Sequence, residues 1–122
     1  MLRITKDELV SMRNSDERFK IIDVLSKESY EREHIKGAIS IPLADIDKET
    51  TRMLKRSDTL AVYCASFECT ASTMAAKKLE ELGFKYVLDY KGGLKEYKEA
   101  GLALEGSLHE NGDKEGKKYC CA

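Results

Sequence analysis

The residue of this sequence best placed for chemistry is a cysteine at the end of an apolar run. Val62 and Tyr63 lead into Cys64, and a short polar stretch then joins Cys64 to an amphipathic segment that begins near Thr70. In open α/β sheets, ligands bind outside the carboxyl ends of the strands, where backbone N–H groups of the following loop attract negative charge. A cysteine in such a place has a lowered pKa and more thiolate. The position therefore predicts a nucleophile that can also carry a terminal persulfide, without a metal or organic cofactor.

The residues after Cys64 are expected to form the substrate-binding loop, which consists of Ala65, Ser66, Phe67, Glu68, Cys69 and Thr70. Cys69 has two interpretations. It either packs between helix and sheet, or acts as a resolving thiol that attacks a persulfide or sulfenate on Cys64 and leaves a disulfide. Cys64 has a structural interpretation too, because a strand-terminal cysteine taken alone is more often a small buried hydrophobe. The strand, loop and helix around Cys64 favour the catalytic interpretation.

Alternating patterns along the chain indicate the elements that position this loop. Short apolar runs predict strands at residues 20–24, 38–41, 60–63 and 86–88. Between them, helices are expected at residues 5–12, 27–33, 47–55, 70–82 and 94–100. Thr5 and Glu8 have the spacing of a capping box, Gly83 is expected to end the fourth helix, and Gly92 and Gly93 are expected to form a turn.

Strands that alternate with helices predict an α/β fold, with a mainly parallel sheet covered on both faces. A chain of 122 residues suits one domain. We expect that domain to occupy residues 1–104, because residues 105–122 are rich in Gly, Lys and Glu and have little to bury. This polar C-terminal tail is expected to be mobile. Its Cys120 and Cys121 belong either to an inert end or to a thiol arm that accepts sulfur from Cys64.

Composition excludes some functions and suggests a compartment. Hydrophobic residues make up 42% and charged residues 35% of the chain, and the formal net charge is -1. This balance gives no overall field for nucleic acid or an anionic membrane. The N-terminus lacks the apolar segment of a secretory signal, and no apolar run approaches the ~20 residues of a membrane-spanning helix. We therefore expect a cytoplasmic protein with reduced thiols, and neither nucleic acid nor membrane as a partner.

Several motifs agree in order and spacing with one known family. Ile22-Asp23-Val24 matches a strand that ends in Asp-Val. A second motif, Tyr…His-Ile-x-Gly-Ala…Ile-Pro, is matched by Tyr30, His34-Ile35-Lys36-Gly37-Ala38 and Ile41-Pro42. The catalytic strand end and the closing segment are matched by Val62-Tyr63-Cys64, Leu79…Leu82-Gly83-Phe84 and Val87…Gly92-Gly93…Tyr97…Ala100-Gly101-Leu102. Over about residues 4–104 the chain resembles the rhodanese domain, in a subset with two cysteines in the active-site loop.

The resemblance implies an α/β/α sandwich around a central, mainly parallel sheet of about five strands. It also implies a sulfurtransferase, which moves a sulfane sulfur from thiosulfate or a persulfide through a Cys64 persulfide to a thiol or cyanide. The partners are then a small-molecule or protein sulfur donor and a thiol acceptor, and no cofactor or metal is required. Asp23 and His34 are expected to be structural residues near the site, which hydrogen-bond to backbone groups.

The loop departs from the family pattern Cys-x-x-Gly-x-Arg-Ser. Phe67 stands in the glycine place and Cys69 in the arginine place, and Leu25 replaces the arginine that often follows Asp-Val. The segment from Cys64 to Leu-Gly-Phe is also two residues longer than usual, so we expect a longer and differently shaped loop. Because no Lys or Arg lies between Cys64 and Ala76, thiosulfate is expected to be a weaker donor than a persulfide.

Other functions remain open at this point. A cysteine phosphatase or arsenate reductase of the same fold needs arginine six residues after the nucleophile, but Thr70 and Ala75 stand six residues after Cys64 and Cys69. A non-catalytic module of this fold is expected to lack the cysteine. The two loop cysteines also suit a thiol redox protein. A metal site is the remaining alternative, although the spacing suits zinc poorly; its ligands are to be drawn from Cys64, Cys69, Cys120, Cys121, His34 and His109.

Overall fold

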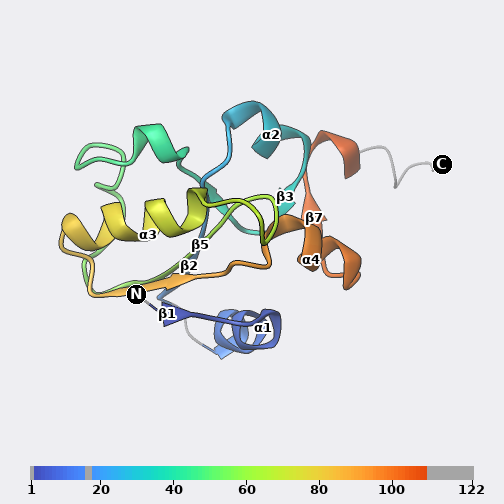
Figure 1. Ribbon diagram of the computed structural model, residues 1–122, viewed down its shortest axis with the longest axis horizontal. Helices are drawn as coiled ribbons and strands as arrows, with labels where there is room; N and C mark the ends of the chain where they lie inside the picture. The colour runs from blue at the N-terminus through green and yellow to red at the C-terminus, as the bar shows by residue number, and fades with distance from the viewer. Residues whose placement is uncertain (1, 16–17, 110–122) are drawn as a thin grey trace.

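The main sheet has five parallel strands in the order β1-β6-β5-β2-β4, in a computed structural model that describes residues 2–15 and 18–109 (Figure 1). The strands are β1 (Leu2–Arg3), β2 (Phe19–Asp23), β4 (Ile39–Ser40), β5 (Thr59–Tyr63) and β6 (Tyr86–Asp89). The expected central parallel sheet of about five strands is confirmed. Since Asp23 lies opposite Tyr63 and Val62 opposite Asp89, the carboxyl ends of the three middle strands meet at one edge.

Helices cover both faces of this sheet, and successive residues of β5 face opposite layers. Leu60 and Val62 pack in one core with helix α3 (Ala71–Glu81), whereas Ala61 and Tyr63 pack in a second core with α1 (Lys6–Ser15) and α4 (Gly93–Glu99). Figure 1 shows α3 and α1 on opposite sides of the strands. Burial on both faces is why the central strands are continuous apolar runs in the sequence.

A second, two-stranded sheet extends the fold past the expected domain boundary at residue 104. After α2 (Lys27–Arg32), the strand β3 (His34–Ile35) pairs antiparallel with β7 (Leu104–Glu105), and a 3₁₀ helix, η2 (Ser107–His109), follows. The Glu105 carboxylate also accepts a hydrogen bond from the backbone N–H of Gly37 at 3.0 Å. Residues 105–109 are therefore part of the described fold. The rest of the expected tail, residues 110–122, lies outside the described residues.

Four of the five expected helices are present, with ends that agree within three residues. At the start of α1, the predicted capping box is formed. The Thr5 backbone N–H donates to the Glu8 carboxylate at 2.8 Å, and the Glu8 backbone N–H donates to the Thr5 hydroxyl at 3.1 Å. Gly83 follows α3 with a φ of 100°, as expected for a residue that ends a helix.

The helix expected at residues 47–55 is wrong. After a short 3₁₀ helix, η1 (Leu43–Asp45), this segment consists of turns. The Asp47 carboxylate accepts from the Thr50 backbone N–H at 2.9 Å, and the Thr50 hydroxyl accepts from the Asp47 backbone N–H at 3.1 Å. The same reciprocal pattern starts α1, but here the backbone bonds that follow are mainly of the i→i+3 type, as from the Arg52 N–H to the Glu49 carbonyl at 3.3 Å and from the Leu54 N–H to the Thr51 carbonyl at 3.0 Å. The segment therefore stays a series of turns, which the charge pattern alone did not reveal.

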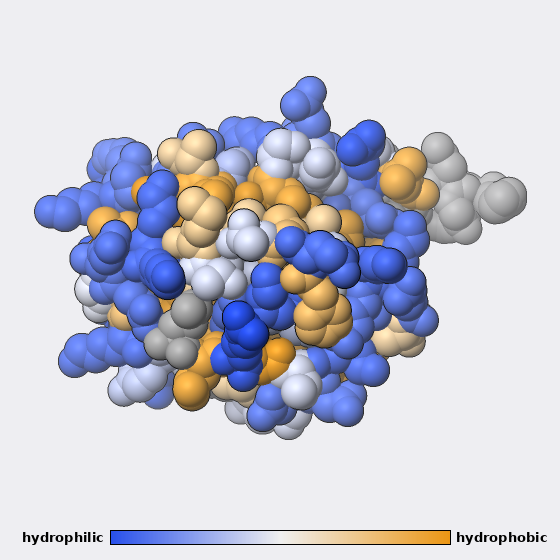
Figure 2. All heavy atoms as spheres, in the orientation of Figure 1, coloured by the Kyte–Doolittle hydropathy of each residue, from blue (hydrophilic) through white to orange (hydrophobic). Residues whose placement is uncertain are grey.

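The surface is mainly hydrophilic on the face shown in Figure 2, where hydrophobic side chains form smaller groups among the hydrophilic ones. The large apolar side chains that are exposed come from separate elements and are Leu2, Met53, Phe67, Met74, Tyr86 and Leu108. Among the described residues, no helix has the length and apolar character needed to cross a membrane.

Candidate active site

Cys64 directly follows β5, the middle strand of the sheet, and is 1% exposed. It begins the loop that leads to α3, and this loop contains a tight turn in which the Cys69 backbone N–H donates to the Ser66 carbonyl at 3.1 Å. Phe67 and Glu68, at the tip of the turn, are exposed. The expected loop residues thus form one compact segment around Cys64 at the carboxyl end of the sheet.

The start of α4 holds this loop in place. Its backbone N–H groups at Leu94 and Lys95 donate to the carbonyls of Cys64 and Ala65, each at 2.9 Å. Gly93 makes this contact possible, because it has a φ of 67° and a Cβ at this position would come within 2.5 Å of the Cys64 carbonyl oxygen. Gly93 is therefore more than the turn residue that the sequence suggested, since it lets the helix approach the nucleophile's backbone.

Backbone carbonyls face the Cys64 sulfur. The thiol donates to the Cys69 carbonyl oxygen at 3.5 Å and contacts the Ser66 carbonyl oxygen at 4.0 Å. Burial raises the pKa of the Cys64 thiol, and a hydrogen bond with the Cys69 side chain raises it further. The lowered pKa expected from the strand-end position is therefore not what the structure indicates, because burial of the thiol disfavours the thiolate and outweighs the lowering by the backbone N–H and hydroxyl of Ser72.

Cys69 lies against Cys64, and its pKa is shifted in the opposite direction. Its partial burial alone would raise its pKa, but hydrogen bonds from Cys64 and from the backbone N–H groups of Ala71 and Ala65 bring that pKa below its ordinary value. The loop thus brings together the two cysteines singled out in the sequence, both as free thiols. Of the pair, Cys69 is the one that more readily becomes a thiolate.

Ser72, which the sequence analysis did not single out as a site residue, lies beside the sulfur. It is fully buried in the first turn of α3, and its interactions favour the thiolate form of Cys64. Its Oγ has no hydrogen-bond partner of ordinary geometry among the described residues. The position of Ser72 on the inner face of the amphipathic helix, two residues after the expected loop, was the available signal.

Two lysines reach the loop from a distant part of the chain. Lys91 follows β6, and its Nζ donates to the Cys69 carbonyl oxygen at 2.6 Å. The pKa of Glu68 lies below its usual range, mainly because the Ser66 hydroxyl donates to its carboxylate at 2.9 Å. The charges of Lys95 and Lys91 lower this pKa further. The expectation of a loop without a cation considered only residues 64–76, whereas Lys91 lies directly before the Gly-Gly turn.

The Asp23 carboxylate accepts hydrogen bonds inside the protein. It accepts from the Leu25 backbone N–H at 2.8 Å and from the Tyr63 hydroxyl at 2.6 Å. The Tyr63 oxygen in turn accepts from the Ile35 backbone N–H at 3.0 Å. Burial raises the pKa of Asp23. This network ties the end of β2 to β5 and β3, and its hydrogen bonds go to the scaffold.

His34 is engaged away from the cysteine loop. Its Nδ1 lies 2.6 Å from the Tyr30 carbonyl oxygen, its Nε2 lies 3.4 Å from a Glu105 carboxylate oxygen, and its ring stacks on that of Tyr30 with centroids 3.7 Å apart. The backbone that His34 contacts belongs to α2. Both His34 and Asp23 therefore support the elements around the site, as a structural role requires.

Within the described residues, no group of three or more His, Cys, Asp and Glu residues is arranged to hold a metal ion, so the structure gives the alternative metal site no support there. Cys120 and Cys121 lie outside those residues.

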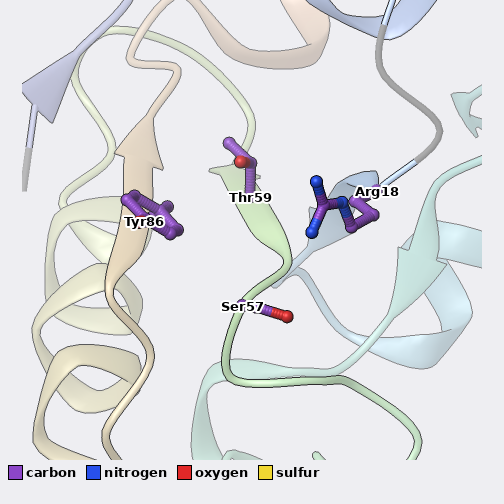
Figure 3. Close-up of a pocket in the computed structure, with 4 residues that line it drawn as sticks. All are labelled: Arg18, Ser57, Thr59 and Tyr86. Atoms are coloured by element: carbon purple, nitrogen blue, oxygen red, sulfur yellow. The ribbon is translucent and has the colours of Figure 1, made fainter.

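A pocket of about 280 Å³, shown in Figure 3, is lined by Arg18, Ser57, Thr59 and Tyr86. Since Thr59 and Tyr86 are the first residues of β5 and β6, this pocket lies at the opposite end of the sheet from Cys64.

Comparison with known proteins identifies related chains. The family model for the Rhodanese-like domain matches residues 5–100. Thiosulfate sulfurtransferase PspE of Escherichia coli is 38% identical over 76 residues, which cover 62% of this chain and 70% of PspE. YrkF of Bacillus subtilis is 34% identical over 84 residues, which cover 69% of this chain but only 44% of YrkF. The solution structure of the rhodanese-like domain of Alr3790 from Anabaena superposes with a TM-score of 0.80 at 28% identity, and covers 98% of this chain and 89% of that domain.

Proposed function

This chain belongs to the family of rhodanese-like domains, and from that premise we propose that it is a sulfurtransferase whose catalytic nucleophile is Cys64. The observation that carries this proposal is the position of Cys64 at the carboxyl end of the central strand, in a loop held by α4. Relatives at 35% and 38% identity are named thiosulfate sulfurtransferases. The residue types and the fold therefore agree on sulfane sulfur as the transferred group.

The proposed first step moves one sulfur atom onto Cys64. The Cys64 thiolate attacks the outer sulfur of thiosulfate, the S–S bond of the donor breaks, and sulfite leaves with the electron pair. A persulfide donor reacts in the same way and releases a thiolate. Because burial raises the pKa of Cys64, its proton has to be removed before attack, and Cys69 is the adjacent titratable group that can accept it.

Two routes remove the sulfur from Cys64. In the first, an external thiol or cyanide attacks the outer sulfur of the persulfide and regenerates the Cys64 thiolate. In the second, the Cys69 thiolate attacks the inner sulfur, the persulfide bond breaks, hydrosulfide leaves after taking up a proton, and a Cys64–Cys69 disulfide remains for a cellular thiol to reduce. The contact between the two cysteines specifically favours this second route.

The proposed function is tested by intact mass spectrometry after the protein is exposed to thiosulfate and, separately, to a low-molecular-weight persulfide. We expect a gain of one sulfur atom on Cys64, faster with the persulfide than with thiosulfate. Cys64→Ser should take up no sulfur at this position and lose transfer activity, because a hydroxyl cannot form a stable persulfide, while its far-UV circular dichroism stays that of the wild type. Near-normal turnover by Cys64→Ser contradicts the assignment of the nucleophile.

A further inference from the structure

Lys91 brings a positive charge next to the nucleophile from outside the cysteine loop. Its Nζ lies 2.6 Å from the Cys69 carbonyl oxygen, and the Cys64 sulfur lies 3.5 Å from the same oxygen. Because the two distances share one atom, the ammonium and the sulfur are separated by at most the sum of the two. At this range a cation has a substantial effect on an anion that contacts the sulfur.

This charge is not neutralised by a close carboxylate. Among the ion pairs formed by the described residues, none includes Lys91. Its bound partner is a neutral backbone carbonyl, which one N–H of the ammonium can satisfy, and two further N–H groups remain for a ligand. Lys91 interacts electrostatically with Glu68, but the Glu68 carboxylate is exposed and accepts a hydrogen bond from the Ser66 hydroxyl.

The backbone around Lys91 is held firmly. The preceding residues Asp89 and Tyr90 are buried, and the Tyr90 backbone N–H donates to the Val62 carbonyl at 2.9 Å. Helix α4 follows, and its backbone N–H groups at Leu94 and Lys95 donate to the carbonyls of the cysteine loop. The ammonium is therefore placed by the same contacts that place Cys64, and it needs no conformational change to reach the site.

Lys95 is chemically identical and stands four residues later, but its surroundings differ. It is exposed and lines a pocket of about 170 Å³ together with Glu68, Glu96 and Glu99. Carboxylates surround this second lysine, whereas the first contacts a carbonyl beside the sulfur. The chain thus contains a matched control for a charge effect at the site.

We propose that Lys91 is the specificity-determining cation of this site, and that its ammonium binds the anionic end of sulfur donors such as thiosulfate beside Cys64. The inference rests on the proposed function for its substrate, and it goes beyond that function by assigning the donor's binding group. During transfer the same ammonium stabilises the negative charge that collects on the departing sulfite. A lysine is a point charge rather than a planar fork, which fits weaker use of thiosulfate than an arginine loop provides.

The test separates charge selection from sulfur transfer by using two alkylating probes. Iodoacetate is an anion and iodoacetamide is neutral, and both alkylate a thiolate with release of iodide. Rates at Cys64 and Cys69 are measured by peptide mapping in the wild type and in Lys91→Gln, Lys91→Arg and Lys95→Gln. The neutral probe reports any change in loop geometry, so the ratio of the two rates isolates the charge. Steady-state kinetics with thiosulfate give KM and kcat for the same variants.

We expect Lys91→Gln to lower the ratio of the iodoacetate rate to the iodoacetamide rate by about threefold to tenfold, and to raise KM for thiosulfate by a similar factor. Lys91→Arg should keep the ratio, and Lys95→Gln should change it by less than about twofold. An unchanged ratio in Lys91→Gln, or an equal fall in Lys95→Gln, overturns the proposal. If the ratio falls as expected but no donor loads sulfur on the wild type, the cation is supported and the sulfurtransferase function fails.

Discussion

Cys64 and Cys69 are neighbours with unequal tendencies to ionise, and this inequality governs the chemistry of the site. Cys64 is almost fully buried and faces carbonyls, while Cys69 is half-buried and receives hydrogen bonds. In such a pair the more acidic thiol ionises first as the pH rises, and the buried thiol keeps its proton longer. Transfer of the Cys64 proton to an ionised Cys69 prepares Cys64 to attack, and the same proton can later pass from Cys69 to the outer persulfide sulfur, which leaves as hydrosulfide while Cys69 attacks the inner sulfur.

The order of the two pKa values can be measured directly. Because burial raises the pKa of Cys64 and hydrogen bonds lower that of Cys69, the alkylation rate of Cys69 by iodoacetamide should reach half its maximum at a lower pH than that of Cys64. The rate at Cys64 should keep rising, about tenfold per pH unit, beyond the ordinary thiol pKa of about 8.5. Peptide mapping across a pH series gives both midpoints, and a lower midpoint for Cys64 contradicts this arrangement.

Cys69→Ser tests the resolving role. After loading with a persulfide, the wild type should yield a Cys64–Cys69 cross-link under non-reducing conditions, because the two thiols are in contact. Because the variant lacks the adjacent base, it should load Cys64 more slowly than the wild type but then retain the Cys64 persulfide, and oxidant should take its Cys64 to sulfinic acid. Non-reducing peptide mapping distinguishes these products. If the variant turns over at the wild-type rate and the wild type never cross-links, Cys69 is a packing residue.

At the scale of elements, the site depends on how α4 meets the loop after β5. The approach is possible only because Gly93 has no side chain towards the Cys64 carbonyl. The sequence pattern placed a turn and a helix here, but it did not reveal that the helix start binds the nucleophile's backbone. The Gly-Gly turn therefore couples the fold's stability to the geometry of the site.

Gly93→Ala should damage both stability and activity. The new Cβ meets the Cys64 carbonyl oxygen at 2.5 Å in a backbone with a φ of 67°, so we expect a loss of roughly 3 kcal/mol and a large fall in Cys64 loading. Gly101→Ala is the matched control, because Gly101 has a φ of 76° but nothing within 4 Å of the added carbon. It should cost about 1 kcal/mol and leave loading unchanged. Urea unfolding and mass spectrometry measure the two effects, and equal losses would refute the role of the close approach.

The regular elements were predictable where local pattern decides them, as for the apolar strand before Cys64 and the capping box at Thr5 and Glu8. The helix expected at residues 47–55 failed because the turns after Asp47 close with i→i+3 backbone bonds, such as the one from the Leu54 N–H to the Thr51 carbonyl, which no hydrophobic period reports. The site's cation was missed because Lys91 meets the loop only through tertiary structure. Likewise, the direction of the pKa shift at Cys64 depends mainly on how deeply the folded loop buries the sulfur, which the sequence does not report.

At the scale of the whole molecule, the C-terminal end of the domain is tied to its middle by the pairing of β7 with β3. His34 and Gly37 both contact the Glu105 carboxylate, and Ile35 pairs with Leu104. The boundary expected at residue 104 would cut through this small sheet. A chain that ends after residue 109 retains every described contact of β7.

Two truncations test this boundary. Removal of residues 110–122 should leave both the unfolding midpoint and the first-step loading of Cys64 unchanged. Removal of residues 105–122 should lower stability by about 1–2 kcal/mol, because the Gly37 N–H loses its acceptor and the two-stranded sheet is shortened. Thermal unfolding measures both variants. If the shorter chain is as stable as the longer one, β7 contributes nothing to the fold. Slower turnover with intact loading, in the variant without residues 110–122, supports the thiol-arm interpretation of Cys120 and Cys121.

The order of strands also determines when this chain can finish folding on the ribosome. β1 is made before the other described strands, yet its neighbour in the sheet is β6, with Leu2 opposite Leu88. At about 5–20 residues per second, roughly 4–17 s pass between the synthesis of these two residues. During that interval the last buried members of the core on which α1 packs, Leu88, Tyr90 and Tyr97, are still missing. Nascent chains stalled before residue 85 should therefore expose Leu9 to protease, and chains stalled once residues 1–109 have emerged should protect it.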